Sequence, residues 1–125
     1  MRFEALRSID SKEAPSLAPD DRPIDLVHLA RTTLGDRSLE REVLQLFDRQ
    51  STLLIARMRA AAPPGTAALA HTMKGSARGI GAWRVARAAE AVELAEGAAA
   101  ALALEALAAA TDEARALIAD LLKAN

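Results

Sequence analysis

A histidine, a lysine, a glycine and an arginine follow one another at helical spacing in the segment AHTMKGSARGIGAW, residues 70–83. At about 100° per residue, Lys74, Gly75 and Arg78 all lie within about 60° of the histidine on one helix face. A neutral imidazole nitrogen is a nucleophile, and positioned cations stabilise the oxygens of a phosphoryl group in transfer. The spacing therefore predicts a phosphoryl-accepting histidine, His71, with Lys74 and Arg78 beside it.

Small residues flank this histidine on the same face. A glycine inside a helix costs about 1 kcal/mol relative to alanine, and alanine is what this chain uses almost everywhere else. Gly75 and Ala67 remove side-chain bulk next to His71, so another protein's active site can close over the ring. We therefore expect Ala67 and Gly75 to be docking positions.

The opposite face of the same helix predicts the core. Leu69, Met73, Ser76 and Ile80 share that face, and His71 lies about 200° from Leu69 and so points to solvent. Ser76 is then a small structural residue at the core.

A carboxylate on the next helix can reach the histidine. A ring that reacts through one nitrogen benefits when the other donates a hydrogen bond, because that bond fixes the tautomer. If the next helix packs antiparallel, its residues 90–93 lie at the level of His71. Glu90 faces away and Glu93 flanks the core stripe, so Glu93 is the predicted orienting residue.

The spacing of apolar residues predicts five helices. They span residues 25–34, from Asp25 as N-cap to Gly35; 37–62, from Asp36 to PPG at 63–65; 66 to Gly79–Gly81; 82–96; and 100–123. The predicted core face of the second helix consists of Leu39, Val43, Leu46, Phe47, Leu54 and Met58. Short connections predict an all-α fold: an antiparallel up-and-down four-helix bundle with a short extra N-terminal helix covering one end.

Composition limits the remaining possibilities. The 125 residues suit one domain, with a flexible tail expected over 1–23, where SKEAPSLAPDDRP holds three prolines, and the bundle over 24–125. The chain has no cysteine and a net charge of -1, so disulfides, thiolate chemistry and nucleic-acid binding are not expected. No long apolar run is present, and we expect a cytoplasmic monomer that does not bind membranes.

The block AHTMKGSARGIGAWRVARAAEAVE resembles the histidine-containing phosphotransfer (HPt) domain. That family's pattern is roughly His-x-Leu-Lys-Gly-Ser/Ala, then Leu-Gly, then a hydrophobic residue and Glu or Gln. The positions that match are His71, Lys74, Gly75, Ser76, Ile80, Gly81, Val92 and Glu93. Met73 stands where leucine is usual, and Gly79 replaces a commonly polar residue at the turn.

The resemblance implies a relay component of a two-component phosphorelay. His71 would accept a phosphoryl group from a receiver-domain aspartate and pass it to another, with Gly81 structural. The partners would be receiver domains of response regulators or hybrid histidine kinases. The chain itself would carry no cofactor, since Mg²⁺ would sit in the receiver. Nothing resembles a nucleotide-binding loop, so the chain is not expected to be an enzyme that uses ATP.

Two other functions remain open from the sequence. A helical adaptor without phosphorylation could bind a receiver or kinase domain and block it, although an intact His71, Lys74 and Gly75 speak against that. A metal-binding or hydrolytic bundle would require inward carboxylates and a Glu-x-x-His motif, and neither appears.

Overall fold

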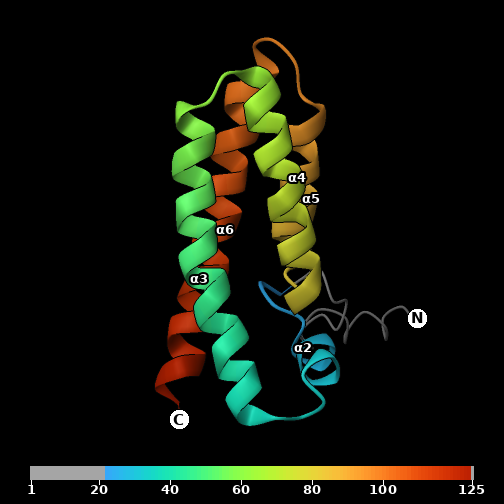
Figure 1. The fold of residues 1–125 in the computed structure, drawn as a ribbon, viewed down its shortest axis with the longest axis vertical. Coiled ribbons are helices and arrows are strands. Elements are labelled where there is room, and N and C mark those ends of the chain that lie inside the picture. The colour runs from blue at the N-terminus through green and yellow to red at the C-terminus, as the bar shows by residue number, and fades with distance from the viewer. Residues whose placement is uncertain (1–21, 125) are drawn as a thin grey trace, which may run out of the picture.

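The computed structural model describes residues 22–124, which contain only helices and their connections. The helices are α2 (Leu26–Thr32), α3 (Arg37–Ala60), α4 (Pro63–Ile80), α5 (Trp83–Leu94) and α6 (Ala99–Lys123) (Figure 1). A flexible tail was expected over residues 1–23, and residues 1–21 of it lie outside the described residues. None of the described helices is both long enough and apolar enough to cross a membrane.

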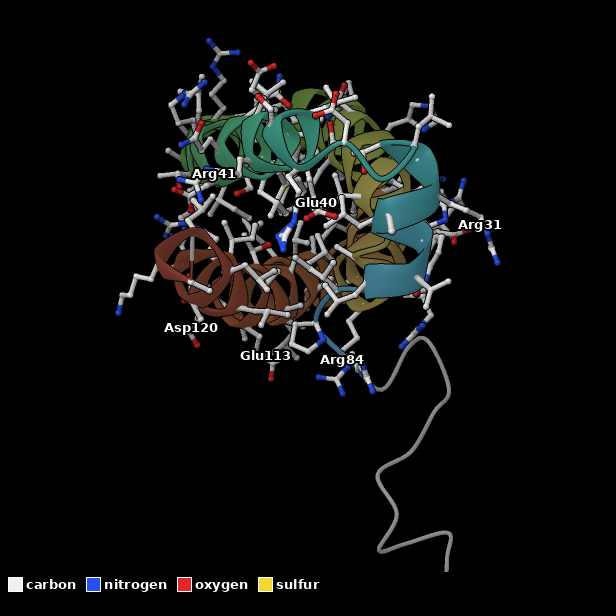
Figure 2. The ribbon with its side chains drawn as sticks, turned by 90° about the horizontal axis from the view of Figure 1, so that it is seen from below. Arg31, Glu40, Arg41, Arg84, Glu113 and Asp120 are labelled. Carbon is white, nitrogen blue, oxygen red and sulfur yellow. The ribbon has the colours of Figure 1, made fainter. Side chains whose placement is uncertain are left out.

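The four long helices run up and down alongside one another, and short α2 lies at one end of the bundle (Figure 1). This arrangement confirms the predicted four-helix bundle with an extra N-terminal helix. Seen from below in Figure 2, charged side chains surround the bundle. Among them, Arg84 Nη1 lies 3.0 Å from Glu113 Oε1 and joins α5 to α6.

Side-chain caps define where α2 and α3 begin. Asp25 Oδ1 accepts from the His28 N–H at 3.1 Å, and Asp36 Oδ1 accepts from the Leu39 N–H at 3.0 Å. The predicted N-cap Asp25 is therefore correct, and Asp36, after which the second helix was predicted to begin, is the N-cap of α3. The first helix nevertheless ends at Thr32 rather than Leu34, because Leu34 and Gly35 adopt positive φ angles of 56° and 72°.

The start of α4 differs from the prediction. The sequence indicated that PPG would separate two helices and that the third would begin near Thr66, but α4 begins at Pro63. A proline in the first helical turn lacks an N–H that would have no intrahelical acceptor there, and its fixed φ suits the helix. The two prolines therefore end α3 and also open α4.

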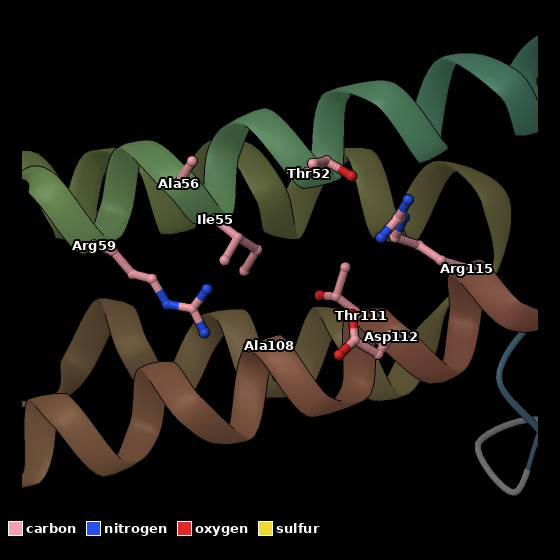
Figure 3. A pocket seen from close by; sticks show the side chains of 8 residues that line it. All are labelled: Thr52, Ile55, Ala56, Arg59, Ala108, Thr111, Asp112 and Arg115. Carbon is pink, nitrogen blue, oxygen red and sulfur yellow. The ribbon is translucent and has the colours of Figure 1, made fainter.

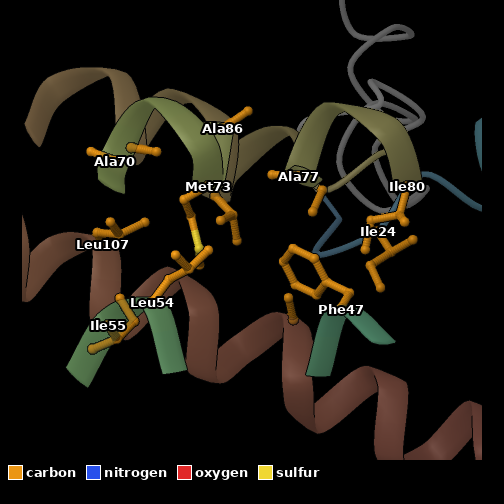
Figure 4. Close-up of a cluster of buried hydrophobic side chains, with 14 of the residues drawn as sticks. Ile24, Phe47, Leu54, Ile55, Ala70, Met73, Ala77, Ile80, Ala86 and Leu107 are labelled. Atoms are coloured by element: carbon orange, nitrogen blue, oxygen red, sulfur yellow. The ribbon is translucent and has the colours of Figure 1, made fainter. Parts of the chain in front are cut away.

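The buried face of α4 is rotated from the one predicted. Ala70, Met73, Ala77 and Ile80 are buried, and Figure 4 shows them facing α3 and α6. Leu69 and Ser76, predicted for the core, are only half-buried. Buried alanines let neighbouring helices approach closely, so the stripe is centred on small residues rather than on the largest apolar ones.

The buried face of α3 also differs. Phe47, Leu54 and Met58 are buried as predicted, together with Leu44, Ser51 and Ile55. Leu39 and Leu46 are exposed instead, and Val43 is half-buried. Because α3 carries two apolar stripes and the bundle covers only one, the periodicity could not determine which stripe would be buried.

Gly81 and Trp83 attach α2 to the turn between α4 and α5. Gly81 has φ +80°, and an added Cβ would lie 2.9 Å from the Asp25 carbonyl oxygen, so only glycine fits. The Asp25 N–H donates to the Gly81 carbonyl at 2.8 Å, and Trp83 Nε1–H donates to Asp25 Oδ2 at 3.0 Å. The Trp83 indole and then the His28 backbone N–H lower the pKa of Asp25.

Candidate functional site

His71 lies on the outer face of α4, with two-thirds (67%) of its side chain exposed. Its Nδ1 is 2.8 Å from Glu93 Oε2 on α5. Glu90, one turn earlier, is exposed. The antiparallel packing of α4 and α5 therefore brings together the two residues paired from the sequence. Since an ionised carboxylate only accepts hydrogen bonds, the ring must donate through Nδ1, which leaves Nε2 as the nitrogen with a free lone pair.

Glu93 has a second partner, Lys74. Its Oε1 lies 2.9 Å from Lys74 Nζ, and the Glu93 side chain is only 23% exposed. This contact is an ion pair, and Oε1 has no hydrogen-bonding partner among the described residues. Lys74 and then His71 hold the pKa of Glu93 below its usual range. Glu93 is therefore an anion at neutral pH, fixed between a cation and the ring.

The position of Lys74 corrects the sequence interpretation. Lys74 was expected on the open face beside the ring, yet only 14% of its side chain is exposed. The reason lies in the close packing of α4 and α5, where Ala70, Ala86 and Ala89 are buried and Glu93 reaches across. The reasoning that paired Glu93 with His71 could have found this contact as well, because Lys74 lies almost one turn further along α4.

The remaining predicted residues form an open surface next to the ring. Arg78 is exposed, and its guanidinium has no ion pair or hydrogen bond within residues 22–124. Gly75 is exposed, and a Cβ added there would meet no atom within 4 Å. Ala67 is half-buried. Gly75 is therefore not required for helix packing. Its lack of a side chain keeps the surface beside His71 open to a partner.

A hollow of about 240 Å³ lies between α3 and α6 (Figure 3). Arg59 pairs with Glu105 at 3.3 Å, and Arg115 Nε lies 2.6 Å from Asp48 Oδ1. The two threonines that line the hollow, Thr52 and Thr111, donate to backbone carbonyls of their own helices. Its arginines and threonines already have partners, and no histidine lines it, so this hollow does not offer the nucleophilic nitrogen of the His71 site.

Within residues 22–124, no group of three or more histidine, cysteine, aspartate or glutamate side chains could hold a metal ion. The polar contacts at His71 thus involve one ring, one carboxylate and one ammonium group. Such an arrangement suits a nucleophilic histidine rather than a metal centre.

Comparison with protein families identifies the chain. The Hpt domain family matches residues 38–123, which is more than half of the sequence. The chain therefore belongs to the Hpt domain family, and its role is histidine phosphotransfer in two-component signalling. Comparison with curated proteins and with solved structures found no match.

Proposed function

We propose that this chain is a phosphorelay intermediate that accepts a phosphoryl group on Nε2 of His71 from a receiver-domain aspartate and then donates it to another receiver. One observation carries the proposal: the ring, whose side chain is 67% exposed, is held through Nδ1 by Glu93 at 2.8 Å, and its other nitrogen has no hydrogen-bonding partner among residues 22–124. The ring is therefore fixed in the tautomer that a nucleophile at Nε2 requires.

The proposed phosphoryl transfer requires no general base. The Nε2 lone pair attacks the phosphorus of an aspartyl phosphate, the bond between phosphorus and the aspartyl oxygen breaks, and the aspartate leaves as a carboxylate. The ring keeps its proton on Nδ1 and becomes cationic, and the Glu93 carboxylate stabilises that charge. Transfer to the next receiver reverses these steps, so the same contact serves both directions.

The surroundings of the ring suit a protein partner. Gly75 and Ala67 leave room for a receiver's active site, and the exposed guanidinium of Arg78 can approach the phosphoryl oxygens. The Mg²⁺ that such a transfer uses would be held by the receiver's acidic pocket. This chain then contributes the nucleophile and its orienting carboxylate, and it acts as a relay component rather than a kinase.

The test uses the two histidines of the chain. The full chain is incubated with phosphorylated receiver domains, and label transfer is compared among the wild type, His71→Gln and His28→Gln. We expect His71→Gln to lose all label while remaining folded, because a surface substitution shifts stability by less than about 0.5 kcal/mol. His28→Gln should still accept label.

Retained label on His71→Gln would place the acceptor elsewhere and overturn the proposal. Receiver binding by the wild type without any label would favour the adaptor function instead. Unfolding of His71→Gln, detected by circular dichroism, would contradict the exposed position of the ring.

A further inference from the structure

The hollow between α3 and α6 belongs to a different seam of the bundle from the histidine site. Residues of α3 and α6 line it, whereas the His71 ring lies on α4 and contacts α5. Its volume of about 240 Å³ is several times the roughly 30 Å³ that one water occupies in the liquid. Pockets for drug-sized ligands begin at about 300 Å³, so this hollow has room for a somewhat smaller molecule.

Small side chains keep the hollow open. Ala56 on α3 and Ala108 on α6 both line it, although helices in protein interiors otherwise pack without space between them. Ile55 adds an apolar wall, and the methylene stems of Arg59 and Arg115 add apolar surface toward the ends. The apolar part of the described lining is therefore aliphatic.

The two arginines of the hollow are each neutralised. Figure 3 shows them toward its opposite ends. Arg59 forms an ion pair with Glu105, and Arg115 forms one with Asp48. Because each pair has no net charge, neither end of the hollow attracts an anion strongly. The charge of the hollow therefore depends on Asp112, its remaining ionisable residue.

Asp112 contributes a carboxylate without a partner. It is exposed and lies beside Thr111 on α6, between the two arginines (Figure 3). Its side chain has no ion pair or hydrogen bond within residues 22–124. Arg115, three residues further along the same helix, pairs with Asp48 instead. The lining thus has one negative charge that no described residue compensates.

The two hydroxyl groups of the hollow already use their single donors. Thr52 Oγ1 donates to the Asp48 carbonyl at 3.0 Å, and Thr111 Oγ1 donates to the Leu107 carbonyl at 2.8 Å. A hydroxyl has one donor and two lone pairs, so both oxygens can still accept a hydrogen bond. Together with Asp112, the hollow therefore offers hydrogen-bond acceptors from both of its helices.

We propose that this hollow binds a small aliphatic primary amine in its ammonium form. An ammonium group carries one positive charge and three N–H donors and has no acceptor. It therefore complements the Asp112 carboxylate and the hydroxyl oxygens of Thr52 and Thr111. The hydrocarbon chain of the amine lies against the aliphatic lining and is removed from water. A carboxylate at the same place would be repelled by Asp112.

The inference does not depend on the phosphotransfer proposal. An amine in the hollow leaves His71 and Gly75 accessible, because both lie on α4 and neither lines the hollow. Since Asp112 is exposed and the ligand is small, we expect weak binding, with a dissociation constant on the order of 1 mM.

The experiment titrates the full chain with hexylamine at pH 7 and follows the backbone amide signals by NMR. The shifts should saturate and should be largest for residues 52–59 and 108–115, which line the hollow. Hexanol and hexanoate are the matched ligands, because they keep the chain length and replace the positive charge with none or with a negative one. Both should bind at least about fivefold more weakly than hexylamine.

Two pairs of variants locate the ammonium group and the chain. Asp112→Asn should weaken hexylamine binding at least about fivefold, whereas Asp120→Asn should leave it unchanged. Asp120 is the matched control, because it is exposed on α6 outside the hollow and its loss changes the net charge equally. Ala108→Leu should abolish binding by filling the hollow, and Ala109→Leu, on the exposed side of α6, should not. Circular dichroism should show all these proteins equally helical.

Several results would each overturn the proposal. One is the absence of saturable shifts up to tens of millimolar hexylamine. Others are hexanoate binding as tightly as hexylamine, which would make the arginines an anion site, and wild-type affinity in Asp112→Asn. Equal weakening by Asp112→Asn and Asp120→Asn would show attraction to the net charge alone, and unchanged binding by Ala108→Leu would place the amine outside the hollow.

Discussion

The two long seams of this bundle use their charged residues in different ways. Between α4 and α5, one carboxylate, Glu93, contacts both His71 and Lys74. Between α3 and α6, the two arginines that line the hollow each have their own carboxylate: Arg59 pairs with Glu105, and Arg115 pairs with Asp48. The first arrangement orients a ring and leaves its Nε2 available, whereas the second pairs its charges one to one. Charged residues in a hollow are therefore not enough for a reactive site. The site also requires an oriented side chain with a nucleophilic atom that has no partner.

The packing of the two seams differs as well. Alanines are buried at the first, namely Ala70 and Ala77 on α4 and Ala86 and Ala89 on α5. The second seam encloses a hollow of about 240 Å³. Close helix packing is what allows the short Glu93 side chain to hold a residue on the neighbouring helix, because a hydrogen bond tolerates little change in distance.

Among variants that keep His71, the largest effect should come from closing the open surface beside the ring. Gly75→Gln should slow phosphoryl transfer from a receiver by about a hundredfold, because a long side chain occupies the approach to His71. The fold should remain intact or gain up to about 1 kcal/mol, since glycine is the poorer helix former and a Cβ meets no atom there. Rapid-quench transfer kinetics and urea unfolding measure the two effects.

Gly79→Gln is the matched control for this variant. Gly79 is also helical and exposed with open space around it, but it lies eight residues from His71, or about 12 Å along the axis. Equal slowing by both variants would show that general helix changes, rather than access to the ring, control the rate.

Removing each cation should have a smaller effect. Lys74→Ala and Arg78→Ala should each lower the transfer rate by about tenfold, at the low end of the range for positioned electrostatic groups. Lys74→Ala should cost more, because it also removes a partner of Glu93. Its defect should depend little on salt, since Lys74 is 14% exposed, whereas the Arg78→Ala defect should shrink as salt rises.

Transfer rates at low and high ionic strength separate the two roles. If the Lys74→Ala defect shrinks with salt as much as the Arg78→Ala defect, Lys74 acts as an exposed cation and its contact with Glu93 has no influence on the rate.

The contact network should also make stability depend on pH. The pKa of Glu93 is lowered from its ordinary value of 4.5, first by Lys74 and then by His71. A carboxylate whose folded-state pKa is depressed stabilises the fold above its unfolded value and loses that contribution as the pH falls through the folded-state pKa. The wild type should thus be more stable than Glu93→Gln at pH 7, and the difference should disappear in acid. Urea unfolding of both proteins from pH 7 to pH 3 checks this, and a constant difference would contradict it.

The smallest effect should come from the other seam. Arg115→Gln removes an ion pair with Asp48 whose side chains are 39% and 37% exposed, so it should cost no more than about 1 kcal/mol of stability. Transfer to and from His71 should stay within about twofold of the wild type, because α3 and α6 contribute nothing to the ring's contacts. A large loss of transfer in this variant would mean that the two seams are coupled.

Several features of this fold can be predicted from the local sequence. Asp25 and Asp36 cap helices because a short carboxylate can accept from backbone N–H groups three residues later. Gly81 ends α4 because it alone tolerates φ +80° against Asp25. Helical periodicity also placed His71 outward and Glu93 within reach of it, since both depend only on the angle per residue and on antiparallel neighbours.

Three features depended on the tertiary structure. Periodicity identifies which faces of α3 are apolar, but only the number and position of neighbouring helices decide that Leu46 stays exposed while Phe47 is buried. Lys74 looked free on its own helix, and only the distance between α4 and α5 gave it Glu93 as a partner. Pro63 could have ended a helix or started one. In the structure, α3 ends at Ala60 just before it, and α4 begins at Pro63. For Leu46 and Lys74, local propensity allowed either outcome, and contacts between residues distant in sequence chose between them.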